Sequence, residues 1–305
     1  MRLWLLAALA LVPASAGASA PTPEALRHWH DREMRVADIG ARLRTANVAL
    51  CPDAVPDPGL AVWTINPTMS ADWRAAWARA LGLGEGAQVT WVAAGGGADR
   101  AGLRVGDTVL AVDGVALAEG RVAFMASLAS ALTQPRMRVD ILRDGHRVGL
   151  TVVAMLACPA TVELLDRRQR NAETRATAVL IYSGMEAALT NDDELAFIIA
   201  HELAHAIHGD AMIGQEKALN DPVIRGRMER DADDLGVAMM ARAGFDPDAA
   251  ARAEDRLAPL QKGWLTGMLG LEFHGAYPRA VDRSAHLRAR AAAVRGDMAR
   301  WGSAP

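Results

Sequence analysis

The segment at residues 191–209 constrains the fold of this 305-residue chain more than any other. From Leu195 to Ile207 every residue is apolar except two histidines and one glutamate, so a helix here is apolar on all sides. Such a helix has no face that suits water and must be buried. Asn191 is placed to cap it, with Glu194 reaching back in a capping box. The polar residues inside the buried stretch therefore need a purpose.

Those polar residues are His201, Glu202 and His205, in the spacing HExxH. Histidines four residues apart lie on one helix face and can bind a single metal ion, while Glu202 is placed to take a proton from water. Zinc peptidases use this arrangement, and we predict one Zn²⁺ per chain. The alternative, in which the three side chains only fill a core, leaves a carboxylate unpaired in an apolar helix, which is costly.

A catalytic zinc site needs a third protein ligand. The extended metzincin pattern requires glycine at position 208 and histidine at 211, and this chain has His208 and Ala211, which excludes that class. Glu229 and Asp233 lie four residues apart on one face of a predicted second helix. Glu229 is the candidate third ligand, and Asp233 is expected to orient a ligating histidine. The alternative for this pair is an ordinary charged helix surface. His208 is expected beside the ligands or at the surface, because one straight helix cannot direct three such residues to one tetrahedral ion.

These motifs together resemble a known family. HELAH, preceded by DDELA and followed by Glu229-x-x-Ala232-Asp233 and ARAGFDP, is similar to the HtpX and BepA type of gluzincin, which is related to the CAAX prenyl endopeptidases. The resemblance covers about residues 162–288. It implies a mostly helical domain with a small sheet, Glu229 as zinc ligand, and hydrolysis of peptide bonds in proteins. It also implies that Asn171-Ala172 and the strand-like run Ala178–Ser183 border the cleft, where substrate lies as an added strand.

One position departs from the family pattern. Many relatives carry His-Pro followed by an arginine, whereas this chain has Tyr277-Pro278 and Arg283. As a catalytic residue, Tyr277 would donate a hydrogen bond to a developing oxyanion. Its alternative is a packing or surface aromatic.

A second pattern occupies residues 58–155. It contains Ala101-Gly102-Leu103, a Gly106-Asp107 turn, a strand-like run at 108–112 and an Asp113-Gly114 turn. Glycines at these places suit tight turns. The segment resembles the PDZ domains of exported bacterial proteases, which implies a module that binds a peptide ligand. The alternative is a generic small α+β domain with well-placed glycines.

The first 20 residues have the features of a cleavable signal peptide: Arg2, an apolar run at 3–12 and Ala18-Ser19-Ala20. We therefore expect export to the periplasm or the medium, with a retained anchor or an N-terminal core helix as alternatives. No later segment approaches the length of a membrane span. In an oxidising compartment Cys51 and Cys158 are expected to form a disulfide, two buried thiols being the alternative. The net charge of −3 provides no basic field for nucleic acid or anionic lipid.

The sequence thus predicts an α+β protein with a mostly helical HExxH metallopeptidase domain, a small sheet and a PDZ-like module. The expected parts are a signal peptide at 1–20, an N-terminal helix and linker at 21–57, the PDZ-like module at 58–155 and the metallopeptidase domain at 156–305. The N-terminal helix is expected to pack on the metallopeptidase domain. The predicted function is an exported zinc endopeptidase, with misfolded envelope proteins as candidate substrates. One alternative is a PDZ-based binding or chaperone-like protein with a weak or degenerate site, and a second is a non-proteolytic hydrolase that uses the same site. An intact Glu202 argues against the first, because a structural zinc site needs no base.

Overall fold

The computed structural model describes residues 20–65, 69–84, 86–117, 121–189, 191–209, 221–261 and 280–301. The predicted signal peptide thus lies almost wholly outside the described residues. The chain divides into two compact units, the first formed by Met1–Ala41 with Asp53–Ala157 and the second by Arg42–Pro52 with Cys158–Pro305. Both contain helices and strands, which agrees with the predicted α+β class. Among the described helices, none is both long and apolar enough to cross a membrane.

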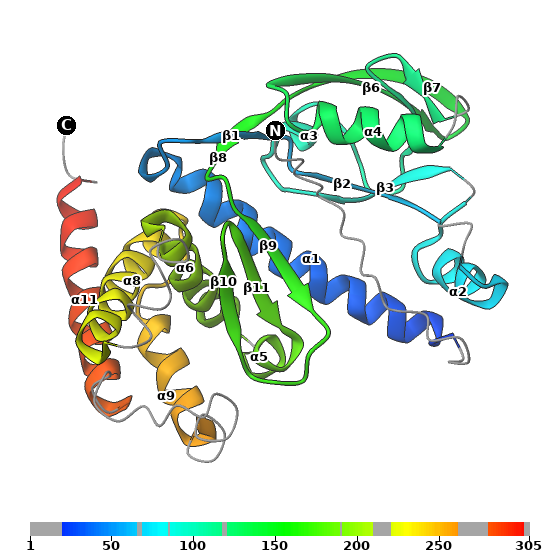
Figure 1. Cartoon of the computed structure of the whole chain (residues 1–305). Coiled ribbons are helices and arrows are strands. Elements are labelled where there is room, and N and C mark those ends of the chain that lie inside the picture. The colour runs from blue at the N-terminus through cyan, green and yellow to red at the C-terminus, as the bar shows by residue number, and fades with distance from the viewer. Residues whose placement is uncertain are drawn as a thin grey trace. The chain divides into compact units, whose positions relative to one another are not determined.

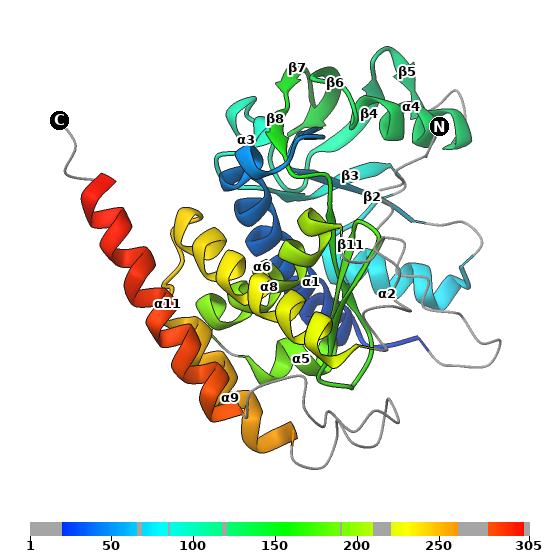
Figure 2. The same ribbon diagram turned by 60° about the vertical axis from the view of Figure 1, so that its left-hand side comes forward.

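The first unit contains a six-stranded sheet in the order β2-β3-β4-β6-β7, with β5 paired to β4. Figure 1 labels β2, β3, β6 and β7 of this sheet, and Figure 2 also labels β4 and β5. Its strands are β2 (Leu60–Thr64), β3 (Ala87–Val92), β4 (Thr108–Val112), β5 (Val115–Ala116), β6 (Arg136–Arg143) and β7 (His146–Val153), and its short helices are α2 (Ala71–Leu81), α3 (Gly97–Arg100) and α4 (Arg121–Ala131). The core lies between the sheet and α4, where Phe124 and Ile141 are fully buried. The β6–β7 hairpin turns at Asp144 and Gly145, both with positive φ (50° and 77°), as a tight hairpin turn requires.

The long N-terminal helix α1 (Pro23–Ala46) differs from the expectation that it packs on the metallopeptidase domain. Most of it groups with the first unit, where the buried His30 Nε2 lies 3.3 Å from the Thr90 carbonyl oxygen. Only its last residues, with the 3₁₀ turn η1 (Val48–Leu50), group with the second unit. There Asn47 Nδ2 donates to the carbonyl oxygen of Met239 at 3.0 Å. The amphipathic pattern alone could not say which domain the helix covers.

The predicted disulfide is present and joins Cys51 to Cys158, with 5.3 Å between their Cα atoms. Both cysteines belong to the second unit, whereas β1 (Val55–Asp57) and β8 (Met155–Ala157) pair as an antiparallel ribbon within the first. The bridge therefore closes a loop that contains the whole PDZ-like segment.

The second unit contains a three-stranded sheet and a group of helices. The strand order is β10-β11-β9, with β10 antiparallel and β9 parallel to β11, so β10 is an edge strand. The elements are β9 (Thr161–Leu165), β10 (Ala172–Arg175), β11 (Ala178–Tyr182), α5 (Ser183–Ala188), α6 (Asp192–His208), α8 (Pro222–Arg242), α9 (Ala249–Gln261) and α11 (Ala280–Trp301). Figure 2 shows α11 running beside α8 and α9.

Most of helix α6 is buried, with Leu195, Ile199 and Leu203 all at 0% exposure. Ile198 and Ile207 are only half-buried, so burial is not complete on every side. Asn191 Oδ1 caps it by accepting from the backbone N–H groups of Asp193 and Glu194. The prediction that the Glu194 side chain completes the capping box is wrong. The Glu194 carboxylate is buried and pairs instead with Arg256 on α9, at 2.8 Å from Nε and 3.1 Å from Nη2.

Candidate metal centre

The candidate metal centre lies where helices α6 and α8 approach each other closely. Gly236 on α8 faces α6, and a Cβ atom added there would lie 3.1 Å from the backbone nitrogen of His201 and 3.2 Å from its Cα. Contacts that short require one of the two backbones to shift. A glycine at this point therefore lets α8 come near enough to place Glu229 and Asp233 beside the histidines of α6.

His201, His205 and Glu229 offer three ligand atoms that all lie within 4.8 Å of one another. The two Nε2 atoms are 3.2 Å apart, and Glu229 Oε2 lies 3.3 Å from that of His201 and 3.8 Å from that of His205. Among the described residues this is the only group of three or more histidine, cysteine or carboxylate side chains placed to share one ion. The structure thus brings together the three side chains that the sequence suggested as ligands.

The spacing of these donors fits a tetrahedral zinc ion. Zinc bonds of roughly 2.0–2.2 Å set neighbouring ligand atoms about 3.3–3.5 Å apart in a tetrahedron. The observed separations of 3.2, 3.3 and 3.8 Å bracket that value. Two imidazoles and one carboxylate leave a fourth position open, as in catalytic zinc sites. The residues present therefore fit the metal that the motif implies.

Asp233 fixes the orientation of the first histidine. Its Oδ1 accepts from His201 Nδ1 at 2.9 Å, and its side chain is only 1% exposed. A proton held on Nδ1 leaves the lone pair of Nε2 directed at the other ligands, which is the usual role of a carboxylate behind a metal-binding histidine. The position of Asp233 agrees with the orienting role suggested by the sequence.

The charges of the site favour a cation. Burial alone would lower the pKa of His201, but hydrogen bonds and charges from Asp233 and Glu229 outweigh it and raise this pKa to about 10. The pKa of His205 is also raised, because the hydrogen bond and charge of Glu229 outweigh the opposing effect of burial. The pKa of Glu229 lies well below its ordinary value despite burial, because both histidines stabilise its charge. Without metal His201 retains its proton at neutral pH, and a divalent ion would replace that positive charge.

Sequence reasoning missed the ion-pair network behind Asp233. Arg283 on α11 donates to both Asp233 oxygens, from Nη2 at 2.7 Å and from Nε at 2.9 Å. Its Nη1 donates to Glu254 of α9 at 3.1 Å, and Glu254 is 4% exposed. The sequence pointed to Arg283 only through its place in the family pattern, and Glu254 belongs to no recognised motif. Four helices thus meet at one buried chain of charges that ends on His201.

Glu202, the candidate base, follows His201 on α6 and contacts the three-stranded sheet. Thr174 of edge strand β10 places its Oγ1 2.9 Å from Glu202 Oε2 and 2.7 Å from the Glu202 carbonyl oxygen. Sequence reasoning missed this contact as well. The only signal was the position of Thr174 between Asn171-Ala172 and Ala178–Ser183, the two stretches that the family resemblance placed along the cleft.

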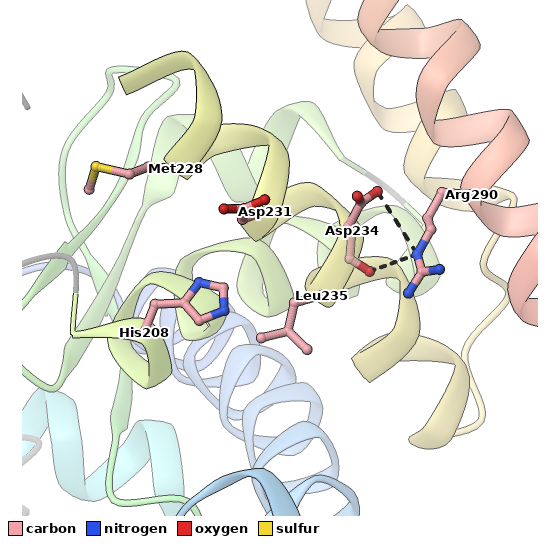
Figure 3. A pocket seen from close by; sticks show the side chains of 6 residues that line it. All are labelled: His208, Met228, Asp231, Asp234, Leu235 and Arg290. Carbon is pink, nitrogen blue, oxygen red and sulfur yellow. Dashed lines mark hydrogen bonds and ion pairs between the residues drawn. The ribbon is translucent and has the colours of Figure 1, made fainter. Parts of the chain in front are cut away.

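His208 lies apart from the ligands, at the surface end of α6. It lines a pocket with the following side chains of α8 and α11: Met228, Asp231, Asp234, Leu235 and Arg290 (Figure 3). Arg290 is bound to Asp234, with Nε 3.1 Å from the carbonyl oxygen. Arg290 Nε also forms an ion pair with Asp234 Oδ1, at 3.9 Å. None of the three ligands lines this pocket. Tyr277, the suggested oxyanion donor, lies outside the described residues.

Comparison with known families agrees with this geometry. Residues 143–225 match the profile of Peptidase family M48, and residues 88–143 match the PDZ domain. The first match includes His201 and His205, and ends before Glu229.

Two curated relatives are metalloproteases. The mitochondrial metalloendopeptidase OMA1 of Saccharomyces cerevisiae is 26% identical over 132 residues, covering 34% of this chain and 38% of the relative. The metalloprotease LoiP of Escherichia coli is 23% identical over 167 residues, covering 44% of this chain and 64% of the relative. The chain therefore spans less than two thirds of either relative. Among solved structures, the HtrA-type protease AlgW with a decapeptide is 30% identical over 34% of this chain and 30% of that chain, with a TM-score of 0.25.

Proposed function

We propose that this chain is an exported zinc-dependent endopeptidase that hydrolyses peptide bonds in protein substrates. The observation that carries the proposal is the convergence of His201, His205 and Glu229 at zinc-ligand spacing, with Glu202 beside them. The match to Peptidase family M48 and the two metalloprotease relatives support proteolysis. Within that chemistry we assign the chain to the gluzincins of the HtpX and BepA type, because its third ligand is a glutamate on a second helix.

The residues divide the chemical work in a simple way. When bound, zinc would polarise the scissile carbonyl and make water more acidic. His201, His205 and Glu229 would hold it, while Asp233 keeps the His201 ring in one orientation. Glu202 would take the proton from the attacking water and pass it to the leaving nitrogen. An extended substrate would pair with the free edge of β10, next to Glu202.

Three further parts of the proposal concern setting and substrate. The leader-like residues 1–20 and the disulfide support export, since disulfides persist in oxidising compartments. Misfolded envelope proteins are the candidate substrates. We assign the PDZ-like module to the binding of a peptide ligand, in support of which residues 88–143 match the PDZ domain. Its role would be recruitment or regulation of substrate, with the catalytic groups in the second unit.

The decisive experiment combines metal analysis with cleavage of casein. We expect one zinc per chain, cleavage by the wild type, and retention of zinc with loss of turnover in Glu202→Gln. Glu163→Gln is a matched control, because Glu163 is an exposed carboxylate in strand β9 of the same unit. Full activity of Glu202→Gln would refute the assigned base. A wild type that suppresses aggregation of unfolded protein without cutting it would instead favour the chaperone-like alternative.

A further inference from the structure

The Thr174 side chain contacts the candidate base at two points. Its hydroxyl oxygen lies 2.7 Å from the main-chain oxygen of Glu202 and 2.9 Å from Oε2 of the same residue. Both are hydrogen-bond distances for an O–H donor. A hydroxyl has one proton to donate and lone pairs to accept, so it can donate to an ionised carboxylate. When Glu202 is protonated, the hydroxyl can accept a hydrogen bond from the carboxyl O–H and donate its own hydrogen bond to the Glu202 carbonyl oxygen.

The backbone of Thr174 faces the open edge of the sheet. The Tyr182 N–H donates to the Asn171 carbonyl oxygen at 3.0 Å, so these two opposed residues form a hydrogen-bonded pair. Such pairs alternate along an antiparallel ladder, which directs the main-chain groups of Glu173 toward β11 and those of Thr174 away from it. Among the described residues no strand pairs with that outer side of β10.

From these two observations we infer that Thr174 is a positioning residue that holds the Glu202 carboxylate from the edge strand β10. The inference rests on the proposed peptidase function. One residue would then present its main chain to an added substrate strand and its side chain to the base. The placement of Glu202 would depend on the register of the strand that receives the substrate.

The test uses variants that separate the hydroxyl from the shape of the side chain. Thr174→Val keeps the branched shape and removes the hydroxyl, whereas Thr174→Ser keeps the hydroxyl. Thr177→Val makes the same exchange in the turn of the same hairpin, three residues from Thr174. Each full-length protein is assayed with a quenched peptide for kcat and KM, and its zinc content is measured.

If the substitution removes a hydrogen bond to a charged group in the transition state, kcat should fall roughly 10- to 100-fold. We expect that fall in Thr174→Val, with KM and zinc content unchanged, near-normal kcat in Thr174→Ser, and no change in Thr177→Val. A wild-type kcat in Thr174→Val would overturn the inference. So would a Thr174→Ser variant as impaired as Thr174→Val, since the hydroxyl would then be irrelevant. If Thr174→Val does not fold, Thr174→Ala replaces it with the same criteria.

A second measurement is independent of turnover. In protein labelled with ¹³C at glutamate carboxyl groups, the Glu202 signal is assigned by its absence in Glu202→Gln. We expect this signal to shift in Thr174→Val and to stay near its wild-type position in Thr174→Ser. An unmoved signal in Thr174→Val would also overturn the inference. If the wild type cleaves no peptide, the proposed function fails, while the NMR comparison still decides whether Thr174 holds Glu202.

Discussion

Arg283 offers the sharpest test of how the site is supported. It lies between two buried carboxylates, donating twice to Asp233 and once to Glu254. The side chain of Arg283 is 19% exposed, and those of Asp233 and Glu254 are 1% and 5% exposed. Arg283→Met keeps much of the length and apolar stem and removes the charge. The change leaves both carboxylates without their shared cation.

The expected cost follows from burial. Removing one partner of a buried ion pair costs about 3–5 kcal/mol, because the remaining charge stays out of water without compensation. Burial raises the pKa of Glu254, so this group can take up a proton when its partner is lost. Asp233 remains bound to His201, and its pKa is held low, against the effect of burial, by Arg283 and His201. We therefore expect a loss of about 3–4 kcal/mol, toward the lower end of that range.

The assay is urea unfolding followed by circular dichroism at a fixed concentration of free zinc. Zinc stabilises the unit that binds it, so the transition that moves with added zinc reports the second unit. Arg288→Met is the matched control on the same helix. Arg288 pairs with Asp255, but these side chains are 56% and 51% exposed, and such pairs contribute less than about 1 kcal/mol. Zinc affinity should also fall roughly 10- to 100-fold in Arg283→Met, since Asp233 loses its anchor.

The reasoning would be refuted by an Arg283→Met protein within about 1 kcal/mol of wild type, or by equal losses in the two variants. Arg283→Lys should be intermediate, because lysine keeps the charge and loses the two-pronged contact with Asp233.

Three other predictions follow from the geometry. Burial raises the pKa of Glu33 from 4.5 to about 7, so the folded state binds this proton more tightly. The contribution of this proton to the free energy of unfolding is complete below pH 4.5 and is lost as the pH rises through 7, a change of about 3 kcal/mol. Glu33→Gln should abolish this part of the pH dependence, measured by urea unfolding at pH 5 and pH 8. Because the pKa of His201 is about 10 without metal, zinc binding at pH 7 should release at least one proton. Calorimetric titration with zinc in buffers of different ionisation enthalpy tests this, and the same heat of binding in every buffer would contradict it. Gly236→Ala should force α8 from α6, lowering stability by about 1–3 kcal/mol together with zinc affinity, and an unchanged affinity would contradict the close approach.

The parts of the site that sequence reasoning found are those fixed by local periodicity. His201 and His205 share one face of their helix whatever the tertiary fold, because they are four residues apart. The apolar residues around them require that the helix be buried. The spacing of Glu229 and Asp233 likewise places them on one face of their own helix. That this face meets α6 depends on Gly236, whose role could not be read from the sequence.

The parts that were missed depend on contacts between elements distant in the chain. Glu194 fitted the pattern of a capping box, but a buried carboxylate pairs more favourably with a cation, and Arg256 lies 62 residues further on. Thr174 and Glu202 are separated by 28 residues, and nothing local to either predicts that they meet. The same holds for the N-terminal helix, whose amphipathic pattern shows that it packs without showing on what.

The bond between Cys51 and Cys158 has a consequence for resistance to proteolysis. The two cysteines are 107 positions apart, and the whole PDZ-like segment lies in the loop they close. A single cut anywhere in that loop leaves both products covalently joined, so a nicked molecule keeps its mass and separates into two chains only on reduction. A cut in the PDZ-like segment would therefore not detach the N-terminal helix from the metal centre.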